Sequence, residues 1–361
     1  MVYNAGGFDP SQLNTPEARR LIAETLQQLN TAISSGVPHE VPEVVRYALE
    51  NNAFIFSGFK AFHTLREVGL SLTTDKGEIK PFETFLKDVE QVNNRYNHNY
   101  LYAEYNHAVG ASLMAARWQQ IEADGDRYDL QYRTAQDDRV REDHAILHGT
   151  TLPPSDPFWA QYLPPNGWNC RCTAVQVRKG KYPQSDPALS MLRGQNCTEA
   201  AKQQIFRFNP GKELKLFPPK HPYYKAPEAA KKELFHIAKR EAQNNAAPIV
   251  LEMDNLQTGK LNQTRKAMQR AYGHAFNQEE LSMYDYIIAN IDKLVFKAFS
   301  PFGEGKDLTN PKHEKNLKKK RERGVTGYNV YSIIISGIEW QVKTEIYKNR
   351  TEAVYHIMKK K

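Results

Sequence analysis

One stretch, Tyr132–Val177, determines how this chain is interpreted. Its sequence is YRTAQDDRVREDHAILHGTTLPPSDPFWAQYLPPNGWNCRCTAVQV. It is rich in Pro, Gly and Trp and predicts short, irregular elements, unlike the sequence before it. It also concentrates arginines, aspartates, two histidines and a Cys-x-Cys pair, in a chain with 3 cysteines altogether. Because so few cysteines leave no room for a disulfide framework, they fit a reducing, intracellular setting.

Several side chains of this stretch have the chemistry of zinc ligands. His144 and His148 would share one face if the segment is helical, and Cys170 and Cys172 point the same way if the chain is extended. His144, Cys170 and Cys172, with His148 as a further candidate, fit a tetrahedral structural zinc site. The alternative is that the cysteines are small buried side chains beside a hydrogen-bonded histidine, because zinc sites more often place two residues between cysteines.

Read as a whole, the stretch resembles the phage Mu F-like head-morphogenesis family. The motif begins with Arg-Thr, an Asp, Arg-Val-Arg and a His, and it ends with Asn-Cys-Arg-Cys. The matching residues are Arg133, Thr134, Asp137, Arg139, Val140, Arg141, His144, Gly149, Asn169, Cys170, Arg171 and Cys172. The resemblance covers roughly residues 54–178, about a third of the chain. It implies a minor capsid protein, present in few copies, that associates with portal and scaffold proteins during head assembly. It implies no enzyme activity, so a zinc hydrolase here is the weaker alternative.

Helical patterns dominate the sequence before this stretch. A helix is expected over Thr15–Leu29 with Pro16 at its first position, and another over VPEVVRYALENN. From Pro81, apolar residues recur at spacings of three and four, and the helix is expected to continue to about Glu122 with a bend at Gly110. Residues 1–180 therefore read as a mainly α head-morphogenesis domain with an irregular Cys/His-containing segment.

The excess positive charge lies at the C-terminal end. The net charge is +8, and residues 286–361 hold 16 Lys+Arg against 8 Asp+Glu, which leaves 33 of each sign in the residues before them. Concentrated basic charge favours phosphate backbones or acidic partners, although a solvated Lys-rich surface is the simpler interpretation. The N-terminus has no signal peptide pattern and no stretch is long and apolar enough for a membrane helix, so a soluble protein without a membrane partner is expected.

The rest of the chain predicts a linker and a second domain. Residues 181–250, with Pro-rich turns and a charged helix, read as a linker. Residues 251–361 read as a small basic α+β domain with two helices, LNQTRKAMQRAYGHAF and QEELSMYDYIIANIDKLV. Three strand-like runs follow, GYNVYSIIISG, IEWQVKTEIY and EAVYHIMKK, with turns around Gly337 and Asn349. They predict an antiparallel meander and a multidomain protein.

This second domain resembles phage-borne nuclease modules grouped with the barnase, EndoU, colicin and RelE nucleases. The resemblance covers about residues 254–361 and rests on the order of elements, the basic tract HEKNLKKKRER and the last two strands. It implies helices followed by a four-stranded antiparallel sheet that holds RNA. Cleavage of RNA without a metal or other cofactor needs a base, an acid and cations around the phosphate.

The domain offers candidates for each of these roles. The catalytic candidates are Lys343, Glu345, His356, His313 and Arg321. The candidates for binding the nucleic acid are Lys318, Lys319, Lys320 and Arg323. On a strand, Lys343 and Glu345 share one face, expected to be open, while Trp340, Val342, Thr344 and Ile346 face a core. An ordinary salt-bridge ladder on a solvated sheet would show the same pattern.

The position of His356 depends on the turn before it. A two- or four-residue loop would place His356 opposite Lys343, whereas a three-residue loop centred on Asn349 would place it beside Val342 and facing inward. The sequence leaves both open. Two functions follow: a virion head protein with a ribonuclease-like toxin domain, or a purely structural capsid protein whose basic domain binds packaged DNA or a capsid partner. The head interior, and the host cytoplasm during assembly or after delivery, are the expected locations.

Overall fold

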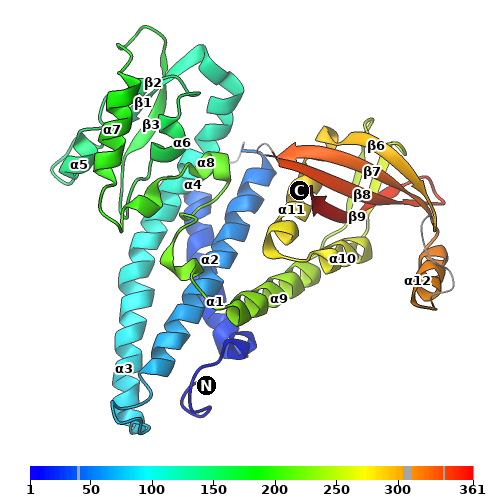
Figure 1. The fold of residues 1–361 in the computed structure, drawn as a ribbon, viewed down its shortest axis with the longest axis horizontal. Helices are drawn as coiled ribbons and strands as arrows, with labels where there is room; N and C mark the ends of the chain where they lie inside the picture. The colour runs from blue at the N-terminus through cyan, green and yellow to red at the C-terminus, as the bar shows by residue number, and fades with distance from the viewer. Residues whose placement is uncertain (39–40, 304–310, 336–337, 361) are drawn as a thin grey trace. The chain divides into compact units, whose positions relative to one another are not determined.

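The fold is described from a computed structural model that covers residues 1–38, 41–303, 311–335 and 338–360 (Figure 1). The chain forms two compact units, Met1–Leu234 and Phe235–Lys361. The boundary between them falls inside helix α9, Glu228–Asn244. None of the described helices combines the length and the apolar composition that crossing a membrane would need.

Long helices form most of the first unit: α1 Pro16–Gly36, α2 Glu43–Leu70, α3 Phe82–Asn94 and α4 Leu101–Asp124 (Figure 1). The Thr15 side chain accepts a hydrogen bond from the Ala18 amide and Pro16 is the first helical residue, which confirms the predicted start of α1. Helix α1 packs against both α2 and α4. A π-helical turn, Arg95–Tyr100, joins α3 to α4, so the irregularity lies there, whereas Gly110 is inside α4.

A small sheet follows these helices. Its strands are β1 Tyr128–Arg133, β2 Thr151–Leu152 and β3 Thr173–Arg178, antiparallel in the order β2-β1-β3. The short helices are α5 Glu142–Ala145, α6 Phe158–Tyr162, α7 Pro187–Cys197 and α8 Pro210–Glu213. Four 3₁₀ turns cover Pro10–Asn14, Gly125–Arg127, Gln204–Phe206 and Pro222–Tyr224. The segment expected to be irregular therefore also contains a three-stranded sheet.

One apolar core joins this sheet to the end of α4. Trp118 of α4, Tyr132 of β1 and Trp159 of α6 are buried together, and all three cysteines lie in the same cluster. Phe206 and Phe217, from the segment expected to be a linker, are also buried in the first unit. The boundaries 1–180, 181–250 and 251–361 stay a prediction about functional domains.

The described part of the second unit contains a six-stranded sheet, the C-terminal part of α9 and three further α-helices (Figure 1). Its strands are β4 Ile249–Glu252, β5 Lys260–Gln263, β6 Val295–Pro301, β7 Val325–Ile335, β8 Ile338–Tyr347 and β9 Glu352–Lys359, in the order β4-β5-β9-β8-β7-β6. All pairs are antiparallel except β5 with β9. The three further helices are α10 Arg265–His274, α11 Gln278–Ala289 and α12 Pro311–Glu322, with a 3₁₀ turn at Ile291–Lys293.

The predicted meander is confirmed as strands β7, β8 and β9, and the two predicted helices as α10 and α11. Three further strands, β4 to β6, bring the sheet to six strands, whereas the resemblance implied four. The turn expected around Gly337 lies outside the described residues. Of the four residues expected on the core face of β8, Trp340, Val342 and Thr344 are buried, whereas Ile346 is only partly buried.

The turn between β8 and β9 does not by itself set the register. The amide of Tyr347 donates to the Thr351 carbonyl at 2.9 Å, which closes a three-residue loop centred on Asn349. That loop alone would place His356 beside Val342. However, Thr344 pairs with Val354 and Lys343 pairs with His356, so Tyr355 is an extra residue in β9. This β-bulge shifts the register by one residue and brings His356 opposite Lys343 after all.

Candidate functional site

A cationic cavity of about 510 Å³ lies within the second unit. Residues from α10, β6, α12 and the last three strands line it: Arg270, His274, Ser300, Pro301, Gly303, Lys312, His313, Asn316, Leu317, Lys319, Lys320, Arg323, Tyr328, Lys343 and Tyr355. Most of its charged side chains are Lys or Arg. A cavity with this lining attracts anions, and phosphate is the anion that such clusters bind most readily.

Two lysines are held against aromatic rings in this cavity. The Lys320 Nζ atom lies 4.4 Å from the Tyr355 ring centroid and donates to the Tyr328 hydroxyl at 2.8 Å. The Lys343 Nζ atom lies 4.5 Å from the centroid of the Tyr328 ring. Cation–π contacts of this kind fix the direction of a flexible side chain without neutralising its charge. Both ammonium groups are therefore held at defined places in the cavity.

The carboxylate of Glu345 offsets part of the positive charge of this cluster. Its carboxylate accepts hydrogen bonds from Arg323 Nη2 at 2.9 Å and from the Tyr347 hydroxyl at 2.8 Å. Arg270 Nη2 and Lys320 Nζ approach it to 3.9 and 4.0 Å.

The expectation that Glu345 lies on an open face is wrong, because its side chain is 2% exposed under these groups. Glu345 lines neither this cavity nor the second cavity of this unit, which is described below. Its geometry is that of a residue that aligns cations.

His274, at the end of α10, is a cavity histidine that the sequence analysis did not predict, as are Arg270 and Lys312 among the charged residues. Its ring lies 4.4 Å from that of Tyr355 and 6.0 Å from that of His356, measured between centroids. Burial, followed by the nearby His356 and Lys320, lowers the pKa of His274 below its ordinary value of 6.5. The imidazole is therefore neutral at pH 7 and has a nitrogen that can accept a proton.

The other predicted residues fall into two groups. His313, Lys319, Lys320, Arg323 and Lys343 line the cavity. His356 is beside the cavity, next to His274, and burial lowers its pKa.

Lys318 and Arg321 are exposed on α12 and do not line the cavity. The Arg321 guanidinium lies over the Phe302 ring at 5.5 Å instead. The structure thus gathers five of the nine predicted residues of this domain around one cavity.

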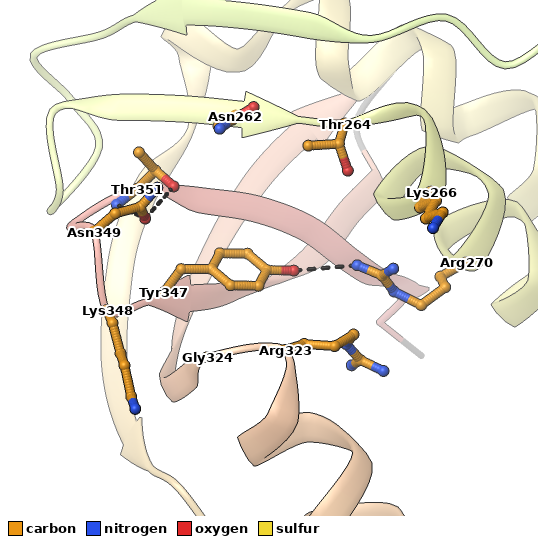
Figure 2. Close-up of a pocket in the computed structure, with 10 residues that line it drawn as sticks. All are labelled: Asn262, Thr264, Lys266, Arg270, Arg323, Gly324, Tyr347, Lys348, Asn349 and Thr351. Atoms are coloured by element: carbon orange, nitrogen blue, oxygen red, sulfur yellow. Dashed lines mark hydrogen bonds between the residues drawn. The ribbon is translucent and has the colours of Figure 1, made fainter.

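A second cavity of about 470 Å³ shares Arg270 and Arg323 with the first. In Figure 2, Tyr347 lies between the two ends of this cavity, and its hydroxyl accepts a hydrogen bond of 3.2 Å from Arg270 Nη2. Lys348 and Asn349, from the β8–β9 turn, lie at the opposite end from Lys266. Arg270 and Arg323 therefore line both basic cavities.

The histidine and cysteines of the first unit also come together. His144 Nδ1 lies 3.5 Å from both Cys170 Sγ and Cys172 Sγ. Arg141 Nη2 donates to His144 Nε2 at 2.8 Å, and since a guanidinium can only donate, the ring proton lies on Nδ1, facing the sulfurs. A hydrogen bond with Cys172 and the nearby His144 hold the pKa of the Cys170 thiol well below its usual value of 9.0.

His148 does not belong to this cluster. Helix α5 ends at Ala145, so the two histidines do not share a helical face. His148 is exposed, and its Nδ1 accepts from the Thr134 amide at 3.2 Å. The remaining charged motif is structural: Arg171 makes two hydrogen bonds of 2.6 and 2.5 Å to Asp137, and these lower the Asp137 pKa to about 2. Cys197 of α7, which the sequence gave no reason to include, lies near His144.

Comparison with known proteins finds similarity in the central region. Residues 77–175 match the family described as Phage Mu protein F like protein. This match covers about a quarter of the chain and ends inside β3, so it contains the Cys/His cluster except Cys197.

Two relatives share this region. The F protein of Escherichia phage Mu, whose name assigns it to capsid assembly, is 41% identical over 69 residues, 19% of this chain and 16% of its own length. The Mu-like prophage FluMu F protein of Haemophilus influenzae is 38% identical over 85 residues, 21% of this chain and 20% of its own length. The chain thus spans a fifth or less of these relatives. No solved structure matches it.

Proposed function

We propose that this chain is a phage head-morphogenesis protein whose second unit is a metal-independent ribonuclease. The match of residues 77–175 to the Mu F-like family supports the first part, because the Mu relative is named for capsid assembly. Portal, capsid and scaffold proteins are the partners that this role requires, and the interior of the virion head is the place. The cavity that combines His274 with Lys320 and Lys343 supports the second part.

The cavity supplies the groups that RNA cleavage needs. Neutral His274 takes the proton of a ribose 2′-hydroxyl, and the 2′-oxygen attacks the adjacent phosphorus. A 2′,3′-cyclic phosphate forms as the bond to the 5′-oxygen breaks. His313, which also lines the cavity, is the proposed donor of the proton that this leaving oxygen receives. No metal or other cofactor takes part in these steps.

The cations have a separate task. Lys343 and Lys320 stabilise the negative charge that grows on the phosphate oxygens in the transition state. Tyr355 and Tyr328 hold both ammonium groups in place, and Tyr355 offers a ring on which a base can stack. Glu345 holds Arg323 and, at longer range, Arg270 and Lys320. In this scheme Glu345 and His356 position other groups and do not transfer protons to the substrate.

A second candidate function needs only the charge. Lys318 and Arg321 are exposed on α12 outside the cavity, and they favour a surface that rests on packaged DNA without cleaving it. Such a surface would bind nucleic acid of any sequence with a steep salt dependence.

The test is cleavage of total bacterial RNA and tRNA by the full chain, with EDTA added to the reaction. We expect discrete cleavage by the parent protein, a loss of at least about 100-fold in His274→Ala, and a similar loss in Lys343→Ala. The matched control is Lys318→Ala, which removes the same charge outside the cavity and should cleave normally. Far-UV circular dichroism before and after EDTA addition checks that every protein stays folded.

Intact RNA at every protein concentration, with only salt-sensitive binding that Lys318→Ala and Arg321→Ala weaken, would support the DNA-surface alternative and overturn the nuclease. The head role is tested separately, by mass spectrometry of purified phage heads. Peptides of this chain at a few copies per particle are expected, and their absence from heads would contradict that role.

A further inference from the structure

Four buried side chains of the first unit could bind a metal: His144, Cys170 and Cys172 lie together, and Cys197 lies near His144. His144 is in α5, Cys170 and Cys172 precede β3, and Cys197 ends α7. Their side chains are 2%, 9%, 8% and 0% exposed, in the order of the chain. Asn169, just before Cys170, has a left-handed backbone with φ of 56°, and its side chain accepts from Asn106 of α4 at 2.9 Å. This turn directs the Cys-x-Cys segment back towards His144.

The spacing of three of these donors is that of ligands around a tetrahedral zinc ion. Zinc binds sulfur at about 2.3 Å and histidine nitrogen at about 2.0–2.1 Å, so a tetrahedral angle separates the two donors by roughly 3.5 Å. The two observed separations between Nδ1 and Sγ are both 3.5 Å. The ligand atoms of His144, Cys170 and Cys172 all lie within 4.8 Å of one another.

Cys197 is the remaining buried thiol near His144; it is grouped with His144 and Asp143 and not with the other two cysteines, so its side chain would have to turn to reach the same ion. Its sulfur, a His144 ring nitrogen and an Asp143 carboxylate oxygen lie within 4.8 Å of one another. Zinc sites with three cysteines and one histidine are a common structural type, and thiolate is preferred to carboxylate in a closed, buried site. We propose that His144, Cys170, Cys172 and Cys197 bind one structural zinc ion.

Asp143 then has a role next to the ion. When zinc takes the place of the proton on Nδ1, the ring proton moves to Nε2, and Arg141 can no longer donate there. Arg141 keeps its hydrogen bond to the Trp168 carbonyl, 3.1 Å away. Asp143 Oδ1 is buried, lies 3.9 Å from Arg141 Nε and has no hydrogen-bond partner among the described residues. Because an Asp143 oxygen lies within 4.8 Å of a His144 ring nitrogen, Asp143 would accept the proton of Nε2. A carboxylate in this position orients a ligating histidine and raises its affinity for the metal.

The ion would cross-link short elements of the first unit. Helix α5 covers only Glu142–Ala145 and strand β2 only Thr151–Leu152, which are too short to be stable alone. Zinc would tie α5 and the start of β3 to α7. This inference is independent of the ribonuclease, which lies in the other unit.

The test begins with the metal content of the full chain, expressed with a tag that lacks histidine and purified without chelators. We expect one zinc per chain by mass spectrometry. After exchange for cobalt(II), intense visible d–d bands and sulfur-to-cobalt charge-transfer bands should report a tetrahedral thiolate site. Cys197→Ser should keep cobalt but lose about a third of the charge-transfer intensity, since two thiolates would replace three. Asp143→Asn should weaken zinc binding by about 10–100-fold.

The control is His148→Ala, which removes a neighbouring exposed histidine outside the cluster and should leave metal content unchanged. Because Cys170→Ser could fail to fold, the parent protein decides the question. No bound zinc in the folded parent, and no uptake of zinc or cobalt on titration, would overturn the proposal and leave hydrogen-bonded thiols. An unchanged cobalt spectrum in Cys197→Ser would overturn the assignment of Cys197.

Discussion

The buried histidine His107 should make the first unit lose stability in mild acid. It lies on α4, is fully buried, and its ring centroid is 5.2 to 5.8 Å from those of Trp168, Phe206 and Phe217. This burial lowers its pKa from 6.5 to about 4. The unfolded chain therefore binds the proton more readily, so stability is full above pH 6.5, falls between pH 6.5 and pH 4, and changes no further below that for this group.

The size of the effect follows from the two pKa values. A shift of 2.5 units corresponds to about 3.4 kcal/mol, and about 2.5 kcal/mol of it is lost by pH 4.5. His221, whose pKa burial lowers to about 3, adds to the loss in the same direction. The variant His107→Phe keeps an aromatic ring of similar size and has no group to protonate, so the His107 contribution should vanish from its pH dependence.

The assay is urea unfolding of both proteins at pH 7.5 and pH 4.5, followed by far-UV circular dichroism. The drop in unfolding free energy between these pH values should be about 2.5 kcal/mol smaller in His107→Phe than in the parent. Any loss that the proteins share, including release of a metal, cancels in this comparison. Equal drops in the two proteins would refute the reasoning that buried His107 is held neutral.

Three further predictions concern other buried charges and the cavity. Lys60→Met should cost about 3–5 kcal/mol in urea unfolding, because it leaves Glu104 buried without its partner at 2.5 Å, and Lys60→Met with Glu104→Leu should recover most of this. Glu345→Gln should lower stability by about 1–3 kcal/mol and increase amide hydrogen exchange in β8, because Arg323 loses its carboxylate. Ribonuclease activity should fall in acid with a midpoint below pH 6.5, as the lowered pKa of His274 requires; a midpoint above 6.5 would contradict its role as the base.

Local signals were sufficient to predict much of the helical framework. Thr15 and Pro16 mark the start of α1, and the alternation of Val342 and Thr344 with Lys343 identifies which face of β8 is buried. These features depend on residues close together in the chain, so their physics can be read from the sequence. The sequence does not predict β1, β2 and β3, because β2 has two residues and all three strands are separated by turns and Pro- and Gly-rich segments.

The sites were harder to predict because they depend on contacts between distant elements. His274 and Lys343 meet at one cavity only because α10 packs against β9. Cys197 joins His144 through the placement of α7, which no spacing rule encodes. The register of β9 was undecidable for a different reason: a single extra residue, Tyr355, reverses the result that the loop length predicts.

The central claim is that the second unit cleaves RNA through the 2′-hydroxyl, and its products test this most directly. The full chain would be incubated in EDTA with an RNA oligonucleotide that contains a mapped cleavage site, and with the same oligonucleotide carrying 2′-deoxyribose at that site. The account predicts a 2′,3′-cyclic phosphate and a 5′-hydroxyl from the first, and no cleavage of the second. Cleavage of both oligonucleotides, a 5′-phosphate product, or no cleavage of either would contradict it.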